Sequence, residues 1–114
     1  MNKSDDISKK VENSLASAQH SAEKGNWAYM KCSIDDALES AKTAGLDLTL
    51  RIKKIELTYY NLAINFTLSE AEKAINSGKT DEANRYITQA ENYGKYAGID
   101  ISARISELKS QRLQ

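Results

Sequence analysis

The sequence predicts an all-α protein of five helices, in which two pseudo-repeated units share one long central helix. First, the 114 residues include no proline, the residue that most disrupts helix interiors. Second, apolar residues recur every three or four positions, which is the spacing of one buried helix face. Third, glycines stand where these apolar patterns stop, as is typical of helix C-terminal caps.

The first helix is expected over about residues 4–24. Ser4 is its predicted N-cap, and Asp5 and Asp6 in the first turn suit the positive end of the helix dipole. Gly25 is expected to end it. The predicted buried face consists of Ile7, Val11, Leu15, Ala18 and Ala22.

The second helix is expected over about residues 27–44, with Asn26 as its N-cap and Gly45 as its C-cap. Leu46 follows at the position of the hydrophobic contact in a Schellman motif. The predicted inward positions are Trp27, Met30, Ile34, Ala37, Ala41 and Ala44.

The long helix is expected over residues 47–76, between Gly45 and Gly78, with Asp47 as its cap. A capping-box pattern at Thr67-x-x-Glu70 leaves open a break near Phe66. One predicted stripe is Leu48, Ile52, Ile55, Tyr59, Leu62 and Phe66, and a second is Leu57, Ile64, Leu68, Ala71 and Ile75.

The fourth helix is expected to begin at Thr80 or Asp81, one of which caps it, and to end near residue 97. Asp100 is the predicted cap of a fifth helix, which frays after Lys109. The inward positions of these two helices are Ala83, Ile87, Ala90, Gly94 and Ala97, then Ile101, Ile105 and Leu108.

A shift of 53 residues aligns residues 15–57 with residues 68–110, and eleven of the 43 positions are identical. Most identities fall on predicted caps and core positions, as expected for a repeated structural unit. The chain is therefore interpreted as one helical domain, 1–114, with internal units of about 4–57 and 58–114. A long shared helix also leaves open an exchange of helices between two chains.

The second unit contains a turn glycine followed by small, bulky and small residues, namely Gly78, Ala83, Ile87 and Ala90. This spacing resembles the second-helix half of a tetratricopeptide repeat, over about a third of the chain. The period of 53 and the absence of a closing proline depart from that family. The resemblance implies helical hairpins stacked around a peptide-binding surface.

Composition narrows the function classes. The formal net charge is zero, with sixteen basic and sixteen acidic residues mixed along the chain, which does not favour nucleic-acid binding. A membrane span is not expected, because no uninterrupted apolar segment is long enough. The N-terminal residues lack the apolar segment of a signal peptide, so a cytoplasmic location is expected. No cofactor is expected.

Several polar groups have both a functional and a structural interpretation. His20-x-x-Glu23 offers two metal ligands, but metal sites in helical bundles use more, and the chain has one histidine. Cys32 lacks an evident base, and it is interpreted as a small, partly buried residue. The cluster of Asp35, Asp36 and Glu39 is interpreted as a solvated helix face. No metal site is predicted.

Asp47 and Arg51 recur as Asp100 and Arg104. The structural interpretation is that each aspartate caps a helix and pairs with the arginine four residues later. The functional alternative is that the two arginines bind an acidic ligand.

Tyr86, Tyr93 and Tyr96 lie on the fourth helix, where the first unit has Ser33, Ser40 and Thr43. The fold therefore does not require aromatic residues there, and aromatic residues are enriched at the centres of interfaces. These tyrosines are predicted to contact a partner, although they also suit closure of the end of the bundle. Trp27 and Tyr29 form a second candidate patch.

The predicted function is a non-catalytic protein–protein interaction module, either an adaptor or an assembly subunit. Its partner would be another protein or peptide, and self-association would bury an exposed apolar strip on the long helix. The alternative is a small-ligand or metal carrier with a site near His20, Cys32 and Tyr59. An enzyme is not expected, because no nucleophile–base pair or phosphate loop is present.

Overall fold

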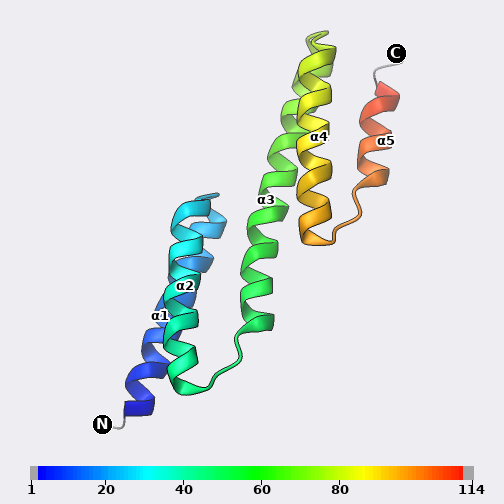
Figure 1. Ribbon diagram of the computed structural model, residues 1–114. Helices are drawn as coiled ribbons and strands as arrows, with labels where there is room; N and C mark the ends of the chain where they lie inside the picture. The colour runs from blue at the N-terminus through cyan, green and yellow to red at the C-terminus, as the bar shows by residue number, and fades with distance from the viewer. Residues whose placement is uncertain (1–2, 112–114) are drawn as a thin grey trace. The chain divides into compact units, whose positions relative to one another are not determined.

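The computed structural model describes residues 3–111 of the chain, and the side chains of residues 6–111. These residues form five α-helices and no β-strand, which confirms the predicted all-α class. The predicted cap Ser4 and first-turn Asp5 lie outside the described side chains. The helices are α1 (Lys3–Glu23), α2 (Trp27–Ala44), α3 (Thr49–Asn76), α4 (Thr80–Ala97) and α5 (Ser102–Gln111) (Figure 1).

The chain divides into two compact units, Met1–Tyr59 and Tyr60–Gln114, and the boundary lies within α3. α3 is one continuous helix, without the break that the capping-box pattern left open near Phe66. Each unit has its own hydrophobic core. The first residues of α3 therefore serve the first unit, and the later residues serve the second.

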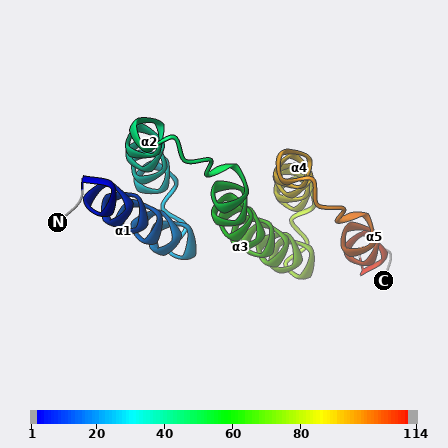
Figure 2. The same ribbon diagram turned by 90° about the horizontal axis from the view of Figure 1, so that it is seen from below.

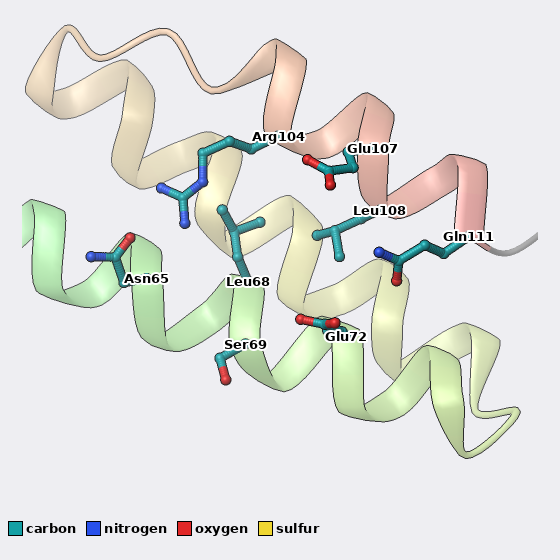
Figure 3. Close-up of a pocket in the computed structure, with 8 residues that line it drawn as sticks. All are labelled: Asn65, Leu68, Ser69, Glu72, Arg104, Glu107, Leu108 and Gln111. Carbon is teal, nitrogen blue, oxygen red and sulfur yellow. The ribbon is translucent and has the colours of Figure 1, made fainter.

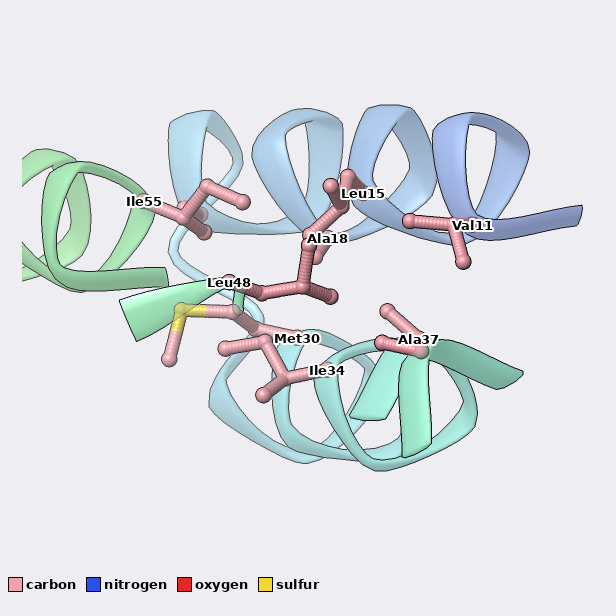
Figure 4. Packing of buried hydrophobic residues seen from close by; sticks show 10 residues of the cluster. Val11, Leu15, Ala18, Met30, Ile34, Ala37, Leu48 and Ile55 are labelled. Carbon is pink, nitrogen blue, oxygen red and sulfur yellow. The ribbon is translucent and has the colours of Figure 1, made fainter. Parts of the chain in front are cut away.

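The core of the first unit lies between α1, α2 and the first part of α3. α1 and α2 run side by side as a helical hairpin (Figures 1 and 2). Met30 and Ala18 are fully buried between them, and Leu48, just before α3, and Ile55 of α3 pack on this hairpin (Figure 4). Burial of such side chains is the main stabilising contribution in a helical hairpin.

The core of the second unit lies between the later part of α3, α4 and α5. Its buried members come from all three helices and from the connection before α5: Ile64, Leu68, Ala71, Ile87, Ala90, Ile101, Ile105 and Leu108. The partly buried residues that pack on this core are Ile75, Tyr86, Tyr93 and Ile99. The tyrosines of α4 therefore adjoin a core built from three helices.

α2 and α4 end in the same way. Gly45 has φ 70° and Gly98 has φ 69°, a left-handed conformation that glycine adopts without strain. The next amide, of Leu46 or Ile99, donates to the carbonyl of Ala41 or Gly94 at 2.9 Å in both cases. These are the hydrogen bonds of a Schellman motif. Both helices have 18 residues, and their ends lie 53 positions apart.

Three predicted boundaries need correction. The N-cap position of α4 is Lys79, not Thr80 or Asp81, and it has no side-chain capping hydrogen bond. α5 continues past Lys109 to Gln111. α3 begins at Thr49, although Asp47 does cap it by accepting from the Thr49 amide at 3.0 Å.

Some positions predicted to be inward are exposed. Leu62 is 41% exposed and Phe66 is 62% exposed, so the first stripe of α3 is not covered along its whole length. Ala44 is exposed at the end of α2, and Trp27 is 38% exposed at its start. Leu46, which follows the Schellman motif of α2, is also exposed, at 46%.

Candidate functional site

Three tyrosines of the second unit form an aromatic cluster, defined here as Tyr60 of α3 with Tyr93 and Tyr96 of α4. The ring centroids of Tyr60 and Tyr93 lie 6.1 Å apart, with the rings tilted by 49°. Those of Tyr60 and Tyr96 lie 6.5 Å apart, with the rings 17° from parallel. Both distances fall within the range of favourable aromatic pairs. Tyr60 is thus the shared member of the tyrosine cluster.

The predicted tyrosines differ in burial. Tyr86 and Tyr93 are half-buried and pack against the second core, as the structural interpretation expected. Tyr96 is 78% exposed, yet its ring stacks on Tyr60. Tyr96 is therefore the member of the cluster that offers most surface to a partner.

Tyr60 was not among the residues predicted from the sequence to contact a partner. It lies four residues before the buried Ile64, so helical spacing places it toward the same face of α3. That spacing was the available signal, but the tyrosine's partners on α4 depend on how the two helices pack.

The second candidate patch, Trp27 and Tyr29, lies in the first unit. The Trp27 ring lies 4.9 Å from the ring of Tyr59, which is itself packed on the first core. The Lys31 ammonium lies 5.7 Å from the Trp27 centroid, within cation–π range. Trp27 is therefore held against its own unit, whereas Tyr29 is 68% exposed.

Arg51 does not pair with Asp47, as had been predicted, but with Glu12 of α1. Two hydrogen bonds join the groups, Nη1–Oε1 at 2.5 Å and Nη2–Oε2 at 2.6 Å. The hydrogen bond from Arg51 lowers the pKa of the Glu12 carboxyl, and the same bond raises the pKa of Arg51. The pKa of Asp47 is lowered mainly by a hydrogen bond from the hydroxyl of Thr49, and to a smaller extent by one from the amide of Thr49.

Arg104 occupies the corresponding place in the second unit. Asp100 accepts hydrogen bonds from the hydroxyl and amide of Ser102, which lower the pKa of Asp100. Among the described side chains, Arg104 forms no ion pair. It lines a groove of about 270 Å³ between α3 and α5, and Figure 3 shows its guanidinium reaching toward Asn65.

The residues considered for metal or thiol chemistry lie on the surface. His20 and Cys32 are exposed, as are Asp35, Asp36 and Glu39. Within residues 6–111, no three histidine, cysteine, aspartate or glutamate side chains are arranged to hold a metal ion. Cys32 is therefore not the partly buried residue that its small size suggested.

None of the helices formed by residues 3–111 is both long enough and apolar enough to cross a membrane. Comparison of this chain with protein-family models, curated proteins and solved structures gives no match.

Proposed function

We propose that this chain is a non-catalytic protein–protein interaction module, an adaptor or a subunit of a larger assembly, with the tyrosine cluster as its contact face. The observation that carries the proposal is that Tyr96 is 78% exposed while its ring stacks on Tyr60. A ring held in this way loses little further freedom when a partner covers it. Its hydroxyl remains available for a hydrogen bond at the edge of the contact.

The other unit supports this interpretation. Positions 53 residues before Tyr93 and Tyr96 hold Ser40 and Thr43, on a helix of the same length with the same C-terminal cap. A helical hairpin of this kind therefore forms without aromatic residues at those positions. The exposed ring of Tyr96 contributes little to its own core, so a contact with another chain is the better explanation.

The partner that suits this surface is a protein helix or peptide with apolar side chains. Aromatic anchors bind such segments by burying area at low entropic cost. The tetratricopeptide-like spacing around Gly78 also implies a peptide-binding surface. A formal net charge of zero gives no overall electrostatic attraction toward nucleic acid. The cytoplasmic location expected from the sequence is part of the same proposal.

A separate apolar surface favours self-association as a second property of the module. Leu62 and Phe66 are exposed on α3, where the first unit has Lys9 and Asn13. At about 100° per residue, Phe66 lies roughly 120° around the helix from Tyr60. The pair is therefore distinct from the tyrosine cluster, and a second copy of the chain would remove it from water.

The identifying experiment is an affinity capture from a lysate of the source organism with the full chain as bait. Three baits are compared: wild type, Tyr96→Thr and Tyr29→Glu. Each substitution introduces the residue that the other unit has 53 positions away. Tyr86 and Tyr93 are left in place, because both pack on the core and their loss would also weaken the fold.

We expect a protein that wild type and Tyr29→Glu retain and that Tyr96→Thr loses. Loss with Tyr29→Glu alone would move the contact face to the first unit. A partner recovered equally by all three baits would contradict the role given to both tyrosines.

A further inference from the structure

The two units contain corresponding surface grooves. The first lies between α1 and α3, and the second lies between α3 and α5. Every residue that lines the first groove has a counterpart 53 positions later that lines the second. Leu15 and Ile55 of the first groove correspond in this way to Leu68 and Leu108. The grooves can therefore be compared position by position.

The grooves differ at the residue opposite the arginine. In the first groove, Glu12 receives two hydrogen bonds from Arg51, so the unit supplies its own carboxylate. In the second groove, the position of Glu12 is held by Asn65, whose amide carries no charge. Arg104 is exposed and forms no ion pair among the described side chains.

We propose that the groove between α3 and α5 binds an acidic side chain of a partner protein, with its carboxylate on Arg104. The arrangement expected is the one that Arg51 and Glu12 form within the first unit. The planar guanidinium of arginine presents two parallel N–H groups that match the two oxygens of a carboxylate. Leu68 lies beside Arg104 and Leu108 lies further along the groove, where they would contact the methylene groups of the bound side chain (Figure 3).

The size and charge of the groove favour a carboxylate over larger or more highly charged ligands. Its volume of about 270 Å³ is below the usual range for sites that enclose a small molecule. Glu72 and Glu107 also line it, and these two acidic residues repel a doubly charged phosphate more strongly than a singly charged carboxylate. Figure 3 shows Glu72 and Gln111 away from Arg104, where they suit a basic residue on the same partner segment.

The groove contains no member of the tyrosine cluster. The proposal therefore does not depend on that cluster being a contact face, and each is tested separately.

The test uses the full ¹⁵N-labelled chain and a probe with one charge, N-acetyl-glutamic acid α-amide. The matched control probe is the corresponding glutamine derivative. The signal followed is the side-chain Nε–Hε resonance of Arg104, with the exposed Arg85 of α4 as a reference. We expect shifts at Arg104 that grow with the concentration of the glutamate probe, no comparable shift with the glutamine probe, and distinctly smaller shifts at Arg85.

Two reciprocal variants separate this site from general attraction to surface cations. Asn65→Glu supplies an internal carboxylate, and it should reduce the shifts that the glutamate probe causes at Arg104. Glu12→Asn removes the internal carboxylate of the first groove, so the Arg51 resonance should begin to respond to the probe. Both variants alter exposed residues, and an unchanged spectrum elsewhere establishes that each is folded.

The proposal is overturned if Arg104 does not respond, or if Arg85 responds equally. It is also overturned if Asn65→Glu has no effect on the Arg104 shifts. Tighter binding of inorganic phosphate than of the glutamate probe would replace the acidic side chain with a phosphate group as the ligand of this groove.

Discussion

Arg51 of α3 holds Glu12 of α1 in a two-point ion pair, although the residues are 39 positions apart. The pair links the first and third helices of the first unit at its surface. The side chains are 49% and 59% exposed, so solvent screens the interaction and its contribution to stability is small. Arg104 is the counterpart of Arg51 in the second unit, and it forms no such ion pair among the described side chains.

The first prediction concerns pH. Hydrogen bonding to Arg51 places the pKa of Glu12 below its ordinary value of 4.5 in the folded chain. The stabilisation is therefore fully present above about pH 4.5, and it is lost as the pH falls through the folded-state pKa. We expect Glu12→Gln to have a lower Tm than wild type at pH 7, by a margin that shrinks as the pH falls through the lowered folded-state pKa of Glu12. Thermal unfolding followed by circular dichroism checks this. A margin that does not change with pH would contradict the assignment.

The second prediction concerns Gly94, which is buried within α4. A Cβ at this position would lie 2.9 Å from the Ile99 carbonyl oxygen and 3.6 Å from Cγ1 of Ile101. Alanine normally stabilises a helix interior by about 1 kcal/mol relative to glycine, whereas overpacking costs about 1–3 kcal/mol. We expect Gly94→Ala to lower the free energy of unfolding by about 1 kcal/mol, measured by urea denaturation. A stabilised Gly94→Ala would show that the turn after α4 moves freely. The counterpart Ala41→Gly is the control, and it should also destabilise, by about 1 kcal/mol.

The third prediction concerns helix capping. Asn26 accepts a hydrogen bond from the Tyr29 amide at 3.2 Å, whereas Lys79 begins α4 in a similar backbone conformation without such a bond. We expect Lys79→Asn to stabilise the chain by about 1 kcal/mol and Asn26→Ala to destabilise it by a similar amount. The exposed contact of Lys79 with Glu82, at 4.0 Å, contributes little and is no obstacle. Parallel denaturation curves for the two variants measure both effects. If Lys79→Asn left the free energy of unfolding unchanged, the introduced asparagine side chain would not be capping α4.

The fourth prediction concerns self-association through Leu62 and Phe66. The double variant Leu62→Lys/Phe66→Asn carries the residues of the first unit at the corresponding positions. Sedimentation at rising protein concentration should show wild type associating and the variant remaining monomeric, since burial of exposed apolar area drives such pairing. Identical association of the two proteins would exclude this surface.

Local signals in the sequence predicted the helix boundaries well. α2 begins after Asn26 and ends before Gly45, as expected, because its capping groups lie within a few residues of the helix. The predicted cap of α4 was wrong, because Thr80 and Asp81 both favour a cap while the backbone places Lys79 there. The preference of threonine and aspartate for the N-cap position identified the turn before α4, but it did not identify which residue of that turn is the N-cap.

Contacts between residues that are far apart in the sequence could not be predicted from local signals. Arg51 was expected to pair with Asp47 one helical turn away, but Glu12 is brought to it by packing of α1 against α3. An apolar stripe likewise predicts which face of a helix is apolar, but not how far along the helix other residues cover it. Leu62 and Phe66 continue the stripe into a part of α3 where it is exposed.

For the tyrosines, the choice of residues could be predicted from the sequence, but their packing could not. Tyr86, Tyr93 and Tyr96 could be selected from the sequence, because the first unit has small polar residues at the same positions. Their different burial could not be predicted, since it depends on how α4 packs against α3 and α5. The stacking of Tyr60 on Tyr96 depends on the same packing.

The most direct test of the interaction function is the dissociation constant of the captured partner for wild type and for Tyr96→Thr. Calorimetric titration with the full chain supplies it, and thermal unfolding of both proteins establishes that the substitution leaves the fold intact. Because Tyr96 is exposed, its replacement should lower Tm by no more than a few degrees, through loss of its stacking on Tyr60. The proposed role as an anchor predicts binding at least about 30-fold weaker, the loss typical of a central aromatic contact. A dissociation constant within about twofold of the wild-type value would contradict it.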